Sequence, residues 1–332
     1  MTTRGPAPST DWRESFWGGS EQAEDQQFAV WAQEIQDIQY NLRAKNNAPA
    51  LRRGFHAKQH VGVDNATLTI PNQIPSHLRV GPFQPGARYP ATVRLSNAGG
   101  TVQPDKKGDL RGLAARVRVS TDTNIDLLAT NAPVSFARDA EQFMIFAKAT
   151  TGPRLKLIPT LLSEVGLKEA IRMLRTAISG TRRPVLSLAT EQYWSRGAYR
   201  FGDYAARFTF VPMAASAVES PQRDPNYLRS EIAVRLRSEA VGWKLMVQLF
   251  ESEKTTPIEN AATRWSTEHS TIAHLTIPAQ DLSAADSATV EEAVDLIEFN
   301  PWNTVDELRP LGNINRARLK VYQASQDIRR RR

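Results

Sequence analysis

Apolar side chains recur at helical spacing near both ends of the chain and alternate with polar ones between them. Residues 21–45 carry apolar side chains three and four positions apart, namely Phe28, Trp31, Ile35, Ile38 and Leu42. This spacing predicts a helix with one buried face. Similar patterns predict helices over 139–180, about 286–297 and about 311–328. In the first of these regions, Asp139 is the expected N-cap of the earlier helix and Gly180 the expected end of a longer helix that follows it.

The middle of the chain alternates polar and apolar residues with a period of two, which is typical of half-buried strands. The predicted strands cover residues 66–70, 92–96, 114–119, 198–212, 229–237, 241–251 and 275–278. Alternation places Val93 and Leu95 on one face of a strand and Arg94 and Ser96 on the other. A face with arginine and serine needs water or a polar partner, and a bound anion would be one such partner.

Strands that pair across long separations, with helices at both ends of the chain, predict an α+β fold built on an antiparallel sheet or barrel. Residues 1–20 are rich in Pro, Gly, Ser and Thr, and we expect them to form a flexible N-terminal segment. We expect residues 21–332 to form a single domain, since this length can bury a sizeable core.

Composition excludes several kinds of chemistry. The chain contains no cysteine, which rules out disulfides, thiolate nucleophiles, cysteine-ligated zinc, iron–sulfur clusters and thiolate-ligated or covalently attached haem. The net charge is +7, and part of it lies in the run 329–332. The other arginines are scattered among carboxylates, so we do not expect nucleic-acid binding. A positive protein suits an anionic cofactor or an acidic substrate.

The hydrophobic pattern gives no sign of a membrane or export signal. No stretch has the uninterrupted apolar length that a transmembrane helix requires, so stable membrane insertion is not expected. Residues 1–10 are polar and lack the apolar core of a secretory signal. The expected location is therefore cytoplasmic.

Five short patches follow one another in a recognisable order. They are Arg53–Lys58, Val93–Asn97, Asp109–Ala114, Asp126–Phe136 and the segment from Phe299 to Arg329. Together they resemble the haem-binding core of the catalase family. The resemblance implies a catalase-like antiparallel β-barrel with surrounding helices, haem b as the cofactor, and an enzyme that acts on peroxides. The chain ends soon after the last patch, so it resembles a minimal member.

The resemblance makes Tyr322 the iron ligand on the proximal side, because catalases use tyrosine there. A free phenol has a pKa of about 10, so a nearby cation is needed to favour the phenolate. Arg318 lies four positions earlier, on the same helical face, and can donate hydrogen bonds to the phenolate oxygen.

On the distal side, the resemblance makes His56 the acid/base. By itself a histidine is more often a packed or surface residue. His56 would take a proton from the peroxide oxygen that binds iron and deliver it to the departing oxygen. Asn131 would donate a hydrogen bond to the peroxide, and Ser96 would orient His56. A plain strand serine is nearly as good an interpretation of Ser96.

The resemblance assigns the haem propionates to Arg53, Arg94 and Arg329, because planar guanidinium groups match carboxylates in two-pronged fashion. Phe136 resembles the aromatic residue that packs against the porphyrin face. The pair Arg111–Gly112 is interpreted as structural. The remaining histidines are interpreted as packing or surface residues, namely His60, His77, His269 and His274.

The leading functional hypothesis is a haem peroxidase that cleaves hydrogen peroxide or organic hydroperoxides and oxidises a small organic reductant. A true catalase and a fatty-acid hydroperoxide isomerase or dehydratase are alternatives within the family. Phe55 stands where typical catalases carry valine, and its bulk would hinder the second peroxide of dismutation. A non-enzymatic haem-binding module is the alternative outside it. A homodimer would cover the haem edges, although no motif points to one.

Overall fold

The computed structural model describes residues 7–45, 53–214 and 224–330. The side chains of Lys45, Arg154, Arg329 and Arg330 are not among those described. Two short strands, β6 (Ala198–Phe201) and β10 (Pro310–Leu311), extend the sheet beyond β7 (Tyr204–Pro212).

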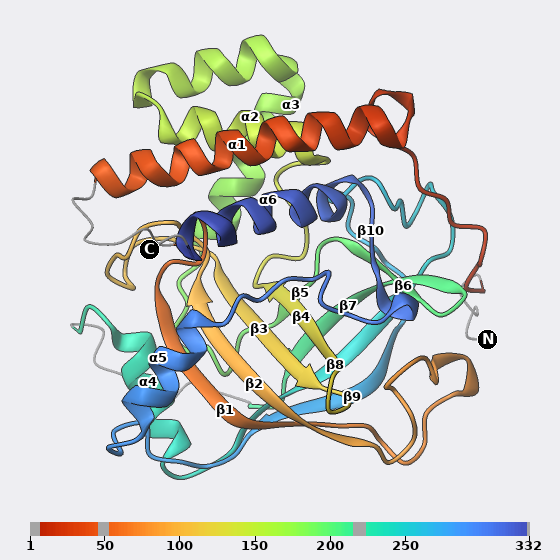
Figure 1. The fold of residues 1–332 in the computed structure, drawn as a ribbon, viewed down its shortest axis with the longest axis vertical. Coiled ribbons are helices and arrows are strands. Elements are labelled where there is room, and N and C mark those ends of the chain that lie inside the picture. The colour runs from red at the N-terminus through yellow and green to blue at the C-terminus, as the bar shows by residue number, and fades with distance from the viewer. Residues whose placement is uncertain (1–6, 46–52, 215–223, 331–332) are drawn as a thin grey trace.

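Within the described residues, eight antiparallel strands close into a barrel (Figure 1). In order around the barrel they are β1 (Gln59–Thr69), β2 (Arg88–Asn97), β3 (Arg111–Arg118), β4 (Asn124–Thr130), β5 (Tyr193–Trp194), β7 (Tyr204–Pro212), β8 (Val241–Leu249) and β9 (His269–Ile277). Pairing of β7 with β8 and of β9 with β1 closes the ring. The predicted α+β fold with an antiparallel barrel is confirmed.

Alternation along β2 and β3 separates an apolar interior from a polar outer face. Val93 and Leu95 point into the barrel core beside Leu113, and all three are almost completely buried. Burial of each such side chain contributes about 1.5–3 kcal/mol. Arg94 and Ser96 point the other way, as predicted, and the carboxylate that Arg94 meets is that of Asp295 at 2.8 Å.

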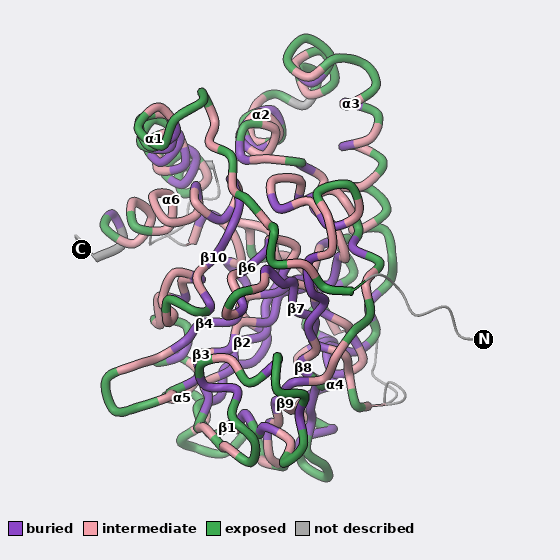
Figure 2. Tube along the Cα trace, turned by 90° about the vertical axis from the view of Figure 1, so that its right-hand side faces the viewer, coloured by how far each residue is buried: buried purple, intermediate pink, exposed green. Residues whose placement is uncertain are grey.

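Six α-helices lie around the barrel in the described part of the chain. They are α1 (Glu21–Lys45), α2 (Ala140–Thr151), α3 (Leu157–Arg182), α4 (Tyr227–Leu236), α5 (Ser287–Leu296) and α6 (Asn313–Arg330). Helices α1, α2, α3 and α6 gather on one side, with α6 nearest the strands (Figure 1). Figure 2 shows the strands mainly buried and α3 mainly exposed or intermediate. The predicted helices are confirmed, with differences at their ends.

Local sequence signals predicted one helix end correctly and another wrongly. Asp139 caps α2 by accepting a hydrogen bond from the backbone nitrogen of Gln142 at 2.9 Å, as predicted. The predicted end of the following helix at Gly180 is wrong, because α3 continues to Arg182. Its backbone breaks instead at Gly166, where φ is 76°.

The predicted strand over 229–237 is wrong, because these residues form most of helix α4. The alternation of Ile232, Val234 and Leu236 suggested a strand, but Val234 is half exposed. Leu228, Ile232 and Leu236 are fully buried at a spacing of four, which is the spacing of one helical face. Arg235 pairs with Glu231 one turn earlier at 3.0 Å.

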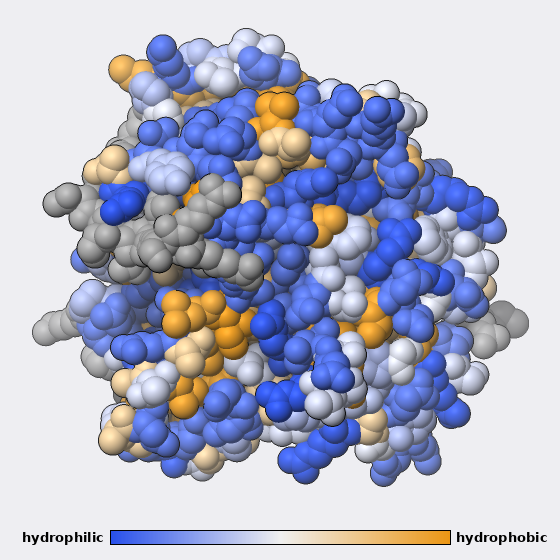
Figure 3. Space-filling model, viewed as in Figure 1, coloured by the Kyte–Doolittle hydropathy of each residue, from blue (hydrophilic) through white to orange (hydrophobic). Residues whose placement is uncertain are grey.

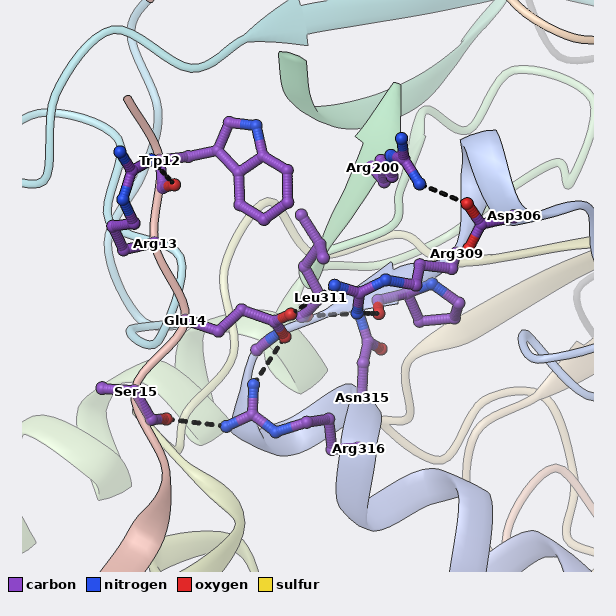
Figure 4. A network of polar contacts seen from close by, with 12 residues as sticks. Trp12, Arg13, Glu14, Ser15, Arg200, Asp306, Arg309, Leu311, Asn315 and Arg316 are labelled. Atoms are coloured by element: carbon purple, nitrogen blue, oxygen red, sulfur yellow. Dashed lines mark hydrogen bonds and ion pairs between the residues drawn. The ribbon is translucent and has the colours of Figure 1, made fainter. Parts of the chain in front are cut away.

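The N-terminal segment fixes the start of α6. Glu14 accepts hydrogen bonds from the backbone nitrogen of Gly312 at 3.0 Å and from Arg316 at 2.6 Å, and it pairs with Arg309 at 2.8 Å (Figure 4). Burial alone would lower the pKa of Arg316, but Glu24 and Glu259 raise it well above its ordinary value. These contacts hold the helix that carries Arg318. The expected boundary at residue 20 stays a prediction.

The face in view in Figure 3 is mainly hydrophilic and carries a few separate apolar patches. No described helix is long and apolar enough to cross a membrane.

Candidate functional site

His56 lies just before β1 in a backbone conformation that non-glycine residues seldom adopt, with φ of 58°. Its backbone nitrogen donates to the carbonyl of Ala98 at 2.9 Å. Its own carbonyl accepts from Arg94 at 2.9 Å. A strained backbone of this kind costs about 1–3 kcal/mol and persists only where surrounding contacts hold it. Arg94 is therefore one of the groups that fix His56.

The imidazole of His56 lies against the outer face of β2 and β3. Its Nδ1 is 3.0 Å from Oγ of Ser96, so the expected contact between these residues is present. The ring also passes directly over Gly112, where a Cβ atom would come within 2.6 Å of it. Gly112 pairs with Ser96 across the two strands. The structural role expected of Gly112 is thus to leave room for the imidazole.

The surroundings of His56 favour its neutral form. Burial, followed by the positive charges of Arg94, Arg196 and Arg318, lowers the pKa of His56 to about 3. The imidazole is therefore uncharged at neutral pH. A neutral imidazole has one N–H and one free lone pair, so it can accept a proton and return it.

Tyr322 and Arg318 form the pair expected from their spacing on α6. Arg318 Nη2 donates to the Tyr322 hydroxyl at 3.0 Å, and its guanidinium lies 5.1 Å from the centre of the Tyr322 ring. Asn315 accepts from Arg318 at 3.1 Å while its own amide donates to the carbonyls of Ala198 and Leu311. Burial lowers the pKa of Arg318, but Tyr322 and Tyr199 outweigh that effect and raise it.

Arg196 joins this group, and the sequence analysis missed it. Besides His56, it is the only non-glycine residue with a positive φ in the described chain, also 58°. It makes no hydrogen bond or ion pair with any described residue. Burial and the like charge of Arg318 lower the pKa of Arg196 to about 10, and Tyr322 opposes them. No local pattern marks such a residue, because its neighbours come from elsewhere in the chain.

His56, Arg196 and Arg318 share one environment. The positive charges of both arginines act on His56, and Arg196 also interacts with Tyr322. All three residues are partly buried. The structure therefore brings the predicted distal and proximal residues together.

Two of the three residues predicted to bind propionates, Arg53 and Arg94, already have partners. Arg53 donates to the backbone carbonyls of Asp295 and Ile297, both at 2.6 Å. Arg94 pairs with the carboxylate of Asp295, which is half exposed. Arg329 lies in the last turn of α6, and its side chain is outside the described residues. The propionate assignments stay predictions.

Asn131 is buried, but its amide is engaged away from His56. Its Oδ1 accepts from the backbone nitrogen of Arg111 at 2.7 Å, and its Nδ2 donates to Glu191 at 2.8 Å. The structure records no contact between Asn131 and His56 within the described chain. The predicted role of Asn131 depends on its one remaining N–H and stays a prediction.

Phe136 belongs to an aromatic cluster beside the site. Its ring is 4.3 Å from that of Phe146 and is stacked on Phe143 at 5.6 Å. Phe55, the residue before His56, contacts Phe143 edge-on at 5.5 Å. The ring of Phe55 therefore packs in this cluster, which includes residues of α2. The predicted packing of Phe136 against a porphyrin stays a prediction.

Comparison with known proteins identifies similar sequences. The family model described as Catalase matches residues 35–265. A protein named catalase-related peroxidase, from Mycolicibacterium paratuberculosis (strain ATCC BAA-968 / K-10), is 30% identical over 303 residues. That match covers 87% of this chain and 92% of the relative.

Solved structures of larger catalases share the fold. A fungal catalase matches with a TM-score of 0.68 at 18% identity, and catalase A from Saccharomyces cerevisiae matches with 0.67 at 16%. A bacterial catalase gives 0.65 at 17%. Each match covers 87% of this chain but only 59–63% of the larger protein.

Proposed function

This chain belongs to the catalase family and is an oxidoreductase, and we propose that it is a haem peroxidase that cleaves hydrogen peroxide or organic hydroperoxides. The proposed cofactor is haem b, with Tyr322 as the iron ligand. The observation that carries this proposal is the hydrogen bond that Arg318 donates to the Tyr322 hydroxyl, because the charge of the same arginine also acts on His56.

The charges of the site fit a haem held by a phenolate. Two guanidinium groups, those of Arg196 and Arg318, meet around one phenol, although buried like charges repel each other. A phenolate on Tyr322 would offset one of these charges. Arg318 already has the geometry to stabilise it, because its hydrogen bond would become charge-assisted. Arg196 would act as a second, longer-range cation.

When bound, haem supplies the redox-active iron at which a hydroperoxide O–O bond is broken. His56 moves the proton. With Nδ1–H donating to Oγ of Ser96, the free lone pair is on Nε2. Nε2 takes the proton from the peroxide oxygen and returns it to the departing oxygen, so the leaving group departs as water or an alcohol. Arg94 fixes the backbone of His56, and Gly112 leaves room for the ring.

Peroxidase activity is favoured over dismutation by one observation. The relative that covers most of this chain is named a catalase-related peroxidase. A true catalase and a fatty-acid hydroperoxide isomerase remain alternatives, and both would use the same His56 and Tyr322. A small organic molecule is the proposed reductant. We also propose that residues 21–332 act as one domain.

The test is an absorption spectrum of the purified protein after haem supplementation, followed by stopped-flow mixing with hydrogen peroxide and with a bulky organic hydroperoxide. We expect a Soret band and the oxidation of an added phenolic reductant. Brisk oxygen evolution without any reductant would favour dismutation. The absence of a Soret band would reject the enzyme proposal, and a Soret band without any reaction with peroxides would favour a haem-binding module.

A further inference from the structure

We infer that Thr130, rather than Asn131, presents the hydrogen-bonding side chain beside His56, and that its hydroxyl donates to a peroxide bound there. The inference rests on the proposed function and names one more residue that would touch the substrate. Three features of the structure support it: the place of Thr130 in the sheet, its unpaired hydroxyl, and the orientation of Asn131.

Thr130 stands on the same rung of the sheet as the residues under the His56 ring. Ser96 pairs with Gly112 across β2 and β3, and Gly112 pairs with Thr130 across β3 and β4. Directly paired residues point to the same face of a sheet. That face is the outer one, where His56 contacts Ser96 and lies over Gly112. Neighbouring strands are about 4.8 Å apart, so Thr130 is the next side chain beyond the imidazole.

The hydroxyl of Thr130 has no partner although it is buried. The residue is 7% exposed, and its Oγ1 makes no hydrogen bond within the described chain. Buried polar atoms without partners are rare, and each calls for an explanation such as a bound ligand. Because Gly112 has no side chain, nothing on that rung separates Thr130 from the His56 ring. A peroxide bound beside His56 would give this hydroxyl its missing partner.

The side chain of Asn131, by contrast, has hydrogen-bond partners at both ends of its amide. The backbone nitrogen of Arg111 donates to its Oδ1, and Glu191 accepts from its Nδ2. Glu191 is itself paired with Arg183, which fixes the position of the carboxylate. With both ends of the amide engaged, rotation toward His56 would break two buried hydrogen bonds. The hydrogen-bond donor beside His56 is therefore Thr130, the residue before Asn131.

The experiment compares Thr130→Val, which keeps the shape and removes the hydroxyl, with Thr130→Ser, which keeps the hydroxyl. Thr209→Val is the matched control. Thr209 also has a fully buried hydroxyl without a partner, but it lies two strands further along, beyond Trp194. Three quantities are measured: the melting temperature of the haem-free protein, the affinity of the ferric haem protein for fluoride, and its rate of reaction with hydrogen peroxide.

We expect Thr130→Val to keep or raise the melting temperature of the haem-free protein, because the hydroxyl that it removes has no partner. Fluoride accepts hydrogen bonds but cannot donate them, so its affinity should fall about tenfold, the effect of one lost hydrogen bond. The reaction with peroxide should slow by a similar factor. Thr130→Ser and Thr209→Val should stay within about twofold of the wild type on both measures.

Each other outcome overturns the inference. Unchanged fluoride affinity and rate in Thr130→Val would remove the role of the hydroxyl, and equal losses in Thr209→Val would show a general effect of the sheet. A clear drop in melting temperature would mean that the hydroxyl is structurally bonded. Thr130→Ala provides a second test if the valine variant does not fold. If the wild type binds no haem, the proposed function fails, while the melting temperatures still report on the unpaired hydroxyl.

Discussion

Arg318 donates a hydrogen bond of 3.0 Å to the hydroxyl of Tyr322, one helical turn further along α6. The same guanidinium also donates a hydrogen bond to Oδ1 of Asn315. Asn315 can approach because Gly197 has no side chain, and a Cβ atom there would come within 2.4 Å of it. The orientation of the phenol is thus fixed through contacts that reach back to the loop carrying Arg196.

Removal of the phenol oxygen should abolish the proposed iron ligand. We expect Tyr322→Phe to lose haem or to shift its visible spectrum, because the ring remains but nothing on it can bind iron. Tyr40→Phe is the matched control, since Tyr40 is half exposed on α1. Absorption spectra of both variants after haem supplementation decide the matter. A wild-type spectrum for Tyr322→Phe would exclude the ligand role.

Arg196 should destabilise the protein when haem is absent. Burial lowers the pKa of this partly buried side chain, which has no hydrogen-bond or ion-pair partner among the described residues. We expect Arg196→Met to raise the free energy of unfolding of the haem-free protein by about 1–3 kcal/mol. In the haem-loaded protein the same variant should alter the spectrum, because one cation that favours the phenolate is lost.

Denaturant unfolding with and without haem measures these two effects separately. Arg175→Met is a control that makes the same substitution at an exposed position of α3. If Arg196→Met left both the stability and the spectrum unchanged, the side chain would have no part in the site.

His56 should be needed for the reaction with peroxide but not for haem binding. We expect His56→Ala to keep a Soret band and to slow that reaction by about 10²–10⁴-fold, the usual contribution of a general acid/base. Ser96→Ala should cause a smaller loss, because it removes only the hydrogen bond to Nδ1. Stopped-flow rates are compared with those of His77→Ala, an exposed histidine. Equal rates in all variants would count against the assigned role.

Gly112 should not tolerate a side chain. A Cβ atom at this position would come within 2.6 Å of the His56 ring and 3.0 Å of Ser96 Oγ. We expect Gly112→Ala to displace the imidazole and to reduce the peroxide rate at least as much as Ser96→Ala does, while haem binding persists. Gly152→Ala serves as the control, because its nearest neighbour would be 3.4 Å away. Retention of the wild-type rate would show that the ring has room to move.

Acid should destabilise the fold through two buried histidines. Burial is the main cause that lowers the pKa of His56 to about 3 and of His60 to about 4. In the unfolded chain both would titrate near their ordinary value of about 6.5. Between these values the unfolded chain binds protons that the folded one does not. The free energy of unfolding should therefore fall as the pH drops below about 6.5, by up to about 1.4 kcal/mol per pH unit for each histidine.

Urea unfolding between pH 7 and 5 measures this slope. His56→Gln should flatten it by the share of one histidine, and the exposed His77→Gln should leave it unchanged. If His56→Gln showed the wild-type slope, the imidazole would be protonated in the folded state.

Local sequence determined the features that neighbouring residues control. The helical spacing of apolar residues located α1, α5 and α6. The four-residue separation of Arg318 and Tyr322 predicted their contact, because residues one turn apart share a helical face. Alternation along β2 likewise predicted that Ser96 would face away from the core. Local signals failed at α4, where the apolar pattern is compatible with either a strand or a helix. The packing of its side chains in the folded protein decided for a helix.

Tertiary structure alone decided the rest of the site. Arg196 and Thr130 carry no sequence signal, since one is an arginine in a short loop and the other a threonine at the end of a strand. Their roles become visible only when strand pairing sets Thr130 beside Gly112 and the fold packs α6 against the loop at 195–197. Burial then leaves a guanidinium and a hydroxyl that make no hydrogen bond with any described residue. Whether a polar group is paired depends on neighbours far away in the chain, and the order of residues does not reveal these.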